Sequence, residues 1–173
     1  MAITRLGGAN AITGTIPQGN IANASLGAVT ALPGAIATGK VLQAVTNTHA
    51  TRFSTSSGSY VGATGYTIAI TPSATSSKIF VIISAMTDSG ASGRGIVATI
   101  YRGSTNLGNT PGINDTYSSG ARIYAPNTMS VLDSPSSTSA VTYQVYVKTS
   151  SGAAVVYNDT EGEAQLTAFE IAG

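Results

Sequence analysis

The chain has no cysteine and few charged residues, and these two absences exclude several classes of protein. Without cysteine, neither a disulfide framework nor a cysteine-ligated metal site can form. Charged residues make up 9% of the chain, against about 25% in a typical soluble domain, and the net charge is +1. Lysine and arginine occur singly, whereas a nucleic-acid-binding face gathers them together. We therefore expect no nucleic-acid partner.

Long hydrophobic runs are also missing. No stretch reaches the ~20 consecutive apolar residues of a transmembrane helix. The start does not resemble a signal peptide, because Arg5 is the only charge before Lys40, and Gly7, Gly8 and Asn10 interrupt the apolar residues. We expect no membrane insertion, and we expect the chain to be synthesised in a cytoplasm.

The residues that catalysis usually needs are scarce. The single histidine, His49, is predicted to lie in a turn between two strands, as a satisfied surface or turn residue. No Gly-x-Ser-x-Gly elbow is present to suggest a nucleophile. No glycine-rich loop follows a strand and opens a helix, as phosphate binding requires. We expect no enzyme activity, no catalytic residue and no cofactor.

The carboxylates leave one enzymatic alternative open. There are seven of them: Asp88, Asp115, Asp133, Asp159, Glu161, Glu163 and Glu170. Most are predicted to lie singly in separate loops, whereas a glycosidase needs two that face each other. The alternative is a carbohydrate-cleaving spike that uses Asp115 with Asp88 or Asp133.

Three of these carboxylates, Asp159, Glu161 and Glu163, form an acidic turn. The turn lacks the alternating ligands and the bidentate terminus of a calcium loop. We predict a solvated turn there and no metal site, although the residues alone leave a bound cation open.

Residues 1–39 differ in composition from the rest of the chain. They carry a thin ladder of aliphatic residues among glycine, alanine, asparagine and threonine, with Pro17 and Pro33 opposing a continuous helix. Such a segment cannot build a core of its own, yet it is more apolar than a solvated linker. We predict an extended anchor or stalk whose ladder packs against sister chains or a larger particle: Ile3, Leu6, Ile12, Ile16, Ile21, Leu26, Val29, Leu32 and Ile36.

Residues 40–173 show the period-2 alternation of β-strands, separated by Ser, Gly, Asn and Pro. This pattern predicts an all-β domain, an antiparallel β-sandwich. The predicted strands are 41–48, 66–71, 78–86, 96–102, 128–133, 141–148, 153–158 and 164–172.

The predicted strand 78–86 is apolar on both faces, which an ordinary sandwich strand is not. Ile79, Val81, Ile83 and Ala85 share one face, and the opposite face carries Phe80, Ile82 and Met86. The closing strand repeats this pattern. Either a loop covers the second face, or it is buried between subunits. We favour the second explanation, because the N-terminal segment independently requires partners.

Long loops are predicted at 87–95, 103–120 and 133–140, and such loops on a rigid β-scaffold often carry binding surfaces. The loop 103–120 offers hydrogen-bonding and stacking groups for a polar ligand such as a sugar. The candidate ligand-facing residues are Asn106, Asn109, Asn114, Asp115 and Tyr117.

Five stretches of the chain resemble tailed-phage fibre proteins of the aquatic-phage type. The N-terminal Ala11-Ile-Thr-Gly-Thr-Ile-Pro17, followed by Ile21-Ala-Asn-Ala-Ser-Leu-Gly27, is similar to repeats in tail fibres. Lys40-Val-Leu-Gln-Ala-Val45, Ile70-Thr-Pro-Ser-Ala-Thr-Ser-Ser-Lys-Ile79 and Leu166-Thr-Ala-Phe-Glu-Ile171 resemble blocks of marine phage fibre tips at matching spacing.

The resemblance implies a homotrimeric virion protein with an N-terminal anchor and a C-terminal jelly-roll-like head. Its partners would be other copies of itself, virion proteins that hold residues 1–39, and a host surface glycan. Because the arm is short for a fibre, a short tail fibre, a head fibre or a capsid decoration protein without an essential receptor role all stay open. A cellular carbohydrate-binding module or a secreted lectin is a further alternative, which the missing signal peptide disfavours.

Overall fold

The computed structural model describes residues 39–158 and 162–173, and these residues form strands, turns and loops with no helix. The all-β prediction is therefore confirmed for this part of the chain. The aliphatic ladder from Ile3 to Ile36 lies outside it. The strands are β1 (Val41–His49), β2 (Phe53–Thr55), β3 (Val61–Ile70), β4 (Lys78–Asp88), β5 (Arg94–Arg102), β6 (Thr105–Asn106), β7 (Asn114–Ser118), β8 (Tyr124–Asp133), β9 (Val141–Thr149), β10 (Val155–Tyr157) and β11 (Ala164–Ile171).

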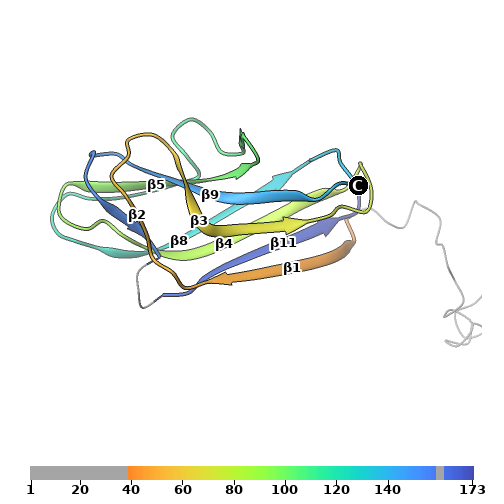
Figure 1. The fold of residues 1–173 in the computed structure, drawn as a ribbon, viewed down its shortest axis with the longest axis horizontal. Helices are drawn as coiled ribbons and strands as arrows, with labels where there is room; N and C mark the ends of the chain where they lie inside the picture. The colour runs from red at the N-terminus through yellow and green to blue at the C-terminus, as the bar shows by residue number, and fades with distance from the viewer. Residues whose placement is uncertain (1–38, 159–161) are drawn as a thin grey trace, which may run out of the picture. The chain divides into compact units, whose positions relative to one another are not determined.

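The strands form two antiparallel sheets that pack face to face as a β-sandwich (Figure 1). In sheet A, β4 pairs with β8 along one side and with β11 and then β10 along the other, while β1 pairs with β11 and β2 with β10. In sheet B, β5 pairs with β9 on one side and with β7 and β6 on the other, and β3 pairs with β9.

The core lies between the sheets and follows from the alternation of each strand. Ile79, Val81 and Ile83 of β4 are fully buried, and so are Val145 and Val147 of β9, in one hydrophobic cluster. Burying an aliphatic side chain of this kind stabilises the fold by about 1.5–3 kcal/mol. Successive residues of a strand point to opposite faces, so the residues between these face outward.

The buried carboxylate of Glu170 connects segments that lie far apart in sequence. Glu170 of β11 accepts hydrogen bonds from the Gln43 amide of β1 (2.6 Å) and from the hydroxyls of Ser73 (2.6 Å) and Ser77 (2.7 Å). It thereby holds the 71–77 connection against the end of sheet A.

Two details of the prediction were wrong. The segment 103–120 is not a single loop, because it contains the short strands β6 and β7, both paired with β5. His49 does not lie in a turn: it ends β1, is half-buried, and packs edge-on against the Tyr66 ring with centroids 4.5 Å apart. Gly65, at a φ of 87°, leaves the space that this imidazole occupies.

Candidate functional site

An open groove of about 520 Å³ lies on the outer side of sheet B. Its lining combines two aromatic rings with hydrogen-bonding side chains, and its volume lies within the usual range for a small-ligand site. We call it the tyrosine groove; it is lined by Gly58, Ser59, Tyr60, Tyr101, Asn106, Thr110 and Lys148.

The alternation of β9 and β5 brings the groove residues to one face. On β9, Val145 and Val147 point into the core, so Tyr146 and Lys148 point outward. On β5, Ile100 points inward and Tyr101 outward. The pairing of β5 with β9 sets Thr99 opposite Tyr146, which places Tyr146 diagonally next to Tyr101.

The aromatic rings form a continuous arrangement. Tyr101 and Tyr146 are stacked, with ring centroids 4.0 Å apart and an interplanar angle of 27°. Tyr60, just before β3, meets Tyr101 edge to face at 6.1 Å. The Lys148 Nζ lies 4.5 Å from the centroid of the Tyr60 ring, in cation–π geometry. All three rings are half-buried, so their other surfaces remain accessible to a ligand.

Hydrogen bonds hold the groove in this shape. The Tyr60 hydroxyl donates to the Pro111 carbonyl at 3.0 Å, which fastens the 107–113 loop over the outer face of sheet B. The Asn106 carbonyl oxygen accepts from the Thr99 hydroxyl (2.7 Å) and from the Gly108 backbone N–H (3.0 Å). Burial raises the pKa of Tyr60, and the nearby Tyr101 and Asp115 raise it further, so its hydroxyl stays protonated at neutral pH.

The structure separates the five residues predicted to face a ligand. Asn106 lines the tyrosine groove, and Asn109 is in the adjoining loop, where its side-chain oxygen accepts from the Gly112 N–H at 3.2 Å. Asn114 lies on β7, where its side-chain oxygen accepts from the Asn127 amide at 2.7 Å and links β7 to β8. Asp115 and Tyr117 are exposed on β7 and do not line the groove.

Sequence reasoning missed the aromatic part of the groove. The alternation of the predicted strand 141–148 places Tyr143, Val145 and Val147 on one face, and Tyr146 and Lys148 on the opposite face. That signal was available. The contact between the Tyr60 and Tyr101 rings could not be predicted, because it depends on the pairing of β3, β9 and β5.

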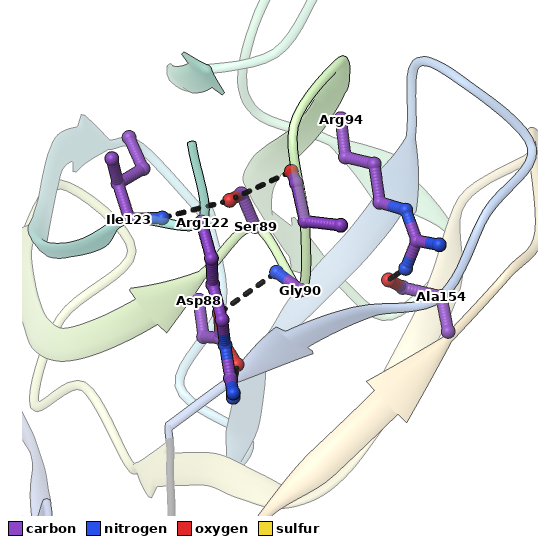
Figure 2. A network of polar contacts seen from close by, with 8 residues as sticks. Asp88, Ser89, Gly90, Arg94, Arg122, Ile123 and Ala154 are labelled. Carbon is purple, nitrogen blue, oxygen red and sulfur yellow. Dashed lines mark hydrogen bonds and ion pairs between the residues drawn. The ribbon is translucent and has the colours of Figure 1, made fainter. Parts of the chain in front are cut away.

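Asp88, one of the carboxylates considered for catalysis, is fully buried at one end of the sandwich. Its side chain accepts two hydrogen bonds from the Arg122 guanidinium (2.9 and 2.5 Å) and one from the Gly90 N–H (2.7 Å). The hydrogen bond from Arg122 is the main reason that its pKa is lowered. Figure 2 shows this carboxylate within a network that also joins Ser89 to Ile123.

Asp133 lies at the opposite end and is also held. Both of its oxygens accept from Arg102 (2.7 and 2.6 Å), and one accepts from the buried Tyr143 hydroxyl (2.8 Å). Asp133 pairs with Ile79 of β4, which is nine residues before Asp88. The two carboxylates therefore lie at positions roughly 30 Å apart along β4. Both carboxylates are thus buried and bonded to arginine side chains, whereas Asp115 is exposed on β7 of sheet B.

A second surface of interest is the outer side of sheet A. Phe80 of β4 lies directly between Leu132 of β8 and Phe169 of β11, and Ile82 follows on the same face. Phe80, Ile82 and Phe169 are half-buried, whereas Leu132 is 54% exposed. We call this surface the apolar face of sheet A; it consists of Phe80, Ile82, Leu132, Phe169 and Ile171.

This arrangement bears on the loop explanation of the two-faced strand, whereas burial between subunits stays a prediction. No described loop covers Leu132, which is 54% exposed beside Phe80 on this surface. A pocket of about 370 Å³ adjoins the face where the chain enters β1, next to Gly39, Lys78 and Ile171.

Within the described residues, no three His, Cys, Asp or Glu side chains gather as metal ligands would. Of the predicted acidic turn, only Glu163 lies within this part, and it is exposed. Comparison with known proteins adds no assignment: neither a protein-family model nor a curated protein matches the chain.

Proposed function

We propose that this chain is a non-enzymatic structural protein of a tailed-phage virion, a short fibre. In this proposal it is a homotrimer, anchored to the particle by residues 1–39, and it displays the β-sandwich outward for attachment to the host. The observation that carries the proposal is the apolar face of sheet A, which leaves large hydrophobic side chains half-buried or exposed on a folded domain.

A free monomer seldom exposes a contiguous apolar surface of this kind, and such a surface usually marks an interaction site. The residues of the face are all uncharged, and Lys78 lies at its margin opposite Ile171. A neutral apolar face suits contact with copies of itself, since it carries no charges that a partner would have to match. Sister subunits are therefore the partners that we assign to it.

The strand order supports a finer description of the head as a jelly roll. Sheet A contains the order β1-β11-β4-β8 and sheet B the order β3-β9-β5-β7, which divides eight main strands equally between the sheets. Viral capsid and lectin domains use this architecture. It suits both assembly into a particle and the recognition of sugars.

Light scattering after size exclusion of the full chain and of Val41–Gly173 tests the proposal. We expect both to be trimers, because the apolar face belongs to the head. Two well-behaved monomers would contradict the fibre proposal and would favour a decoration protein that assembles only on a particle.

Particle assembly tests the anchor separately. Deleting residues 1–39 should abolish incorporation into virions and leave a folded head, as judged by its thermal unfolding. Normal incorporation of the shortened chain would contradict an anchoring role for this segment.

A further inference from the structure

We infer that the tyrosine groove binds a sugar of a bacterial surface polysaccharide. The inference rests on the proposed attachment function and names a ligand class and a site for it. Three of the residues that carry it, Tyr60, Tyr101 and Lys148, belong to strands or connections outside the 103–120 loop.

The chemistry of the groove matches a pyranose ring on two sides. One face of such a ring presents C–H groups, which pack on an aromatic side chain, and its edge presents hydroxyls. Tyr60 and Tyr101 offer accessible aromatic surface, and the Tyr101–Tyr146 stack limits the motion of the central ring. Groups that bond hydroxyls surround these rings, namely the side chains of Ser59, Asn106, Thr110 and Lys148.

The groove is organised before any ligand arrives. Asn106 has its carbonyl oxygen occupied by Thr99 and Gly108, and its amide nitrogen donates to no other described residue. That nitrogen is therefore available as a donor held in a fixed position. Binding then requires little ordering of side chains, which would otherwise reduce the affinity.

Charge argues against a nucleic-acid ligand. Lys148 is the one cation in the groove lining, and the Asp115 carboxylate lies close enough to affect the Tyr60 pKa. A phosphate backbone needs several cations and is repelled by a carboxylate. A neutral or weakly charged sugar does not need several cations and is hardly repelled by the Asp115 carboxylate.

The experiment uses the full chain on an array of bacterial O-antigen and capsular oligosaccharides, with a single-stranded oligonucleotide as comparison. Binding to the strongest oligosaccharide is then titrated by tyrosine fluorescence, since the chain has no tryptophan to mask it. We expect Tyr101→Ala and Lys148→Ala each to weaken binding by about tenfold or more.

Tyr117→Ala is the matched control. Tyr117 is 58% exposed on the same sheet but does not line the groove, so its removal should change the affinity by less than about twofold. Lys148→Ala leaves the core untouched, which guards against misreading an unfolded Tyr101 variant.

Three results would overturn the inference: no oligosaccharide binds, the oligonucleotide binds instead, or Tyr117→Ala weakens binding while Lys148→Ala does not. The trimer mass and virion incorporation are measured independently. A trimer that enters particles but binds no sugar would therefore reject this groove and leave the fibre proposal standing.

Discussion

Glu170 is a carboxylate with 1% of its surface exposed, and it is nevertheless stabilised in the charged form. Burial alone would raise its pKa, but hydrogen bonds from Ser73, Gln43 and Ser77 outweigh burial and lower the pKa from 4.5 to about 2. The backbone N–H of Ser73 adds a further bond at 2.6 Å. The negative charge thus fastens the connection between β3 and β4 to the closing strand.

The pH dependence of stability follows from the sign of this shift. Because the folded pKa lies below the unfolded value, the contribution of Glu170 is complete above about pH 4.5 and is lost as the pH falls toward about 2. Glu170→Gln should lower the free energy of unfolding at pH 7 by about 1–3 kcal/mol, since charge-assisted bonds are lost and an amide group faces other donors. It should also flatten the acid dependence.

Urea unfolding at pH 7 and pH 3 measures both effects. Glu163→Gln, at an exposed carboxylate outside this network, is the control. If the glutamine variant at position 170 keeps the full acid dependence, another group must be responsible for it.

At the scale of the element, β4 is the most informative strand, because its two faces have different partners. Ile83 is fully buried between the sheets, and its neighbour Ile82 is half-buried on the apolar face of sheet A. The same residue type at adjacent positions therefore allows a matched comparison.

Ile83→Ser should lower the free energy of unfolding by about 3–5 kcal/mol, because it leaves a cavity and buries a hydroxyl. Ile82→Ser should cost the isolated head less than about 1 kcal/mol, yet it should weaken self-association. Urea unfolding gives the first quantity, and light scattering across a dilution series gives the second. If the Ile82→Ser trimer dissociates at the same dilution as the unchanged chain, the apolar face is not part of the subunit contact.

The two faces of β9 could be predicted from sequence, because its alternation leaves one register for a buried face. For β4 and β11 the sequence predicted which residues share a face, but both faces are apolar, so it did not show which one lies in the core. Strands β6 and β7 could not be predicted. The sequence of β7, Asn114-Asp-Thr-Tyr-Ser118, is polar throughout, and it forms a strand because it pairs with β5. The start of β3 was missed for a related reason, since Gly62 and Gly65 dilute the alternating pattern.

The candidate site was harder to predict than the fold. Asn106 was identified from its loop, but its neighbours Tyr60 and Tyr101 are separated by 41 residues and meet only after sheet B has formed. The contact of Asn114 with β8 could not be predicted, because a polar loop residue looks the same in sequence whether it faces a ligand or bridges two strands. Only its bond to the buried Asn127 distinguishes the two.

At the scale of the whole molecule, the low charge of the chain sets how copies can associate. With 9% charged residues and a net charge of +1, little long-range repulsion separates two copies. Association through a neutral apolar face should then depend on buried area and hardly on ionic strength.

The self-association constant should therefore stay constant or increase between about 0.05 and 1 M NaCl, because salt screens charges but does not weaken apolar contacts. Sedimentation of the full chain at several salt concentrations measures this dependence. Dissociation at high salt would mean that ion pairs, and not the apolar face, hold the subunits together.

The pairing of β1 with β11 also has a practical consequence for anyone labelling this protein. The Gly39 N–H donates to the Ala172 carbonyl (3.2 Å), and the Ala172 N–H donates to the Lys40 carbonyl (2.8 Å). The last residues of the chain thus lie beside the point where residues 1–38 join the sandwich. A fluorophore or purification tag placed after Gly173 would report on, or obstruct, events at that junction, whereas one inserted in the exposed turn at Gly120 would leave the junction free.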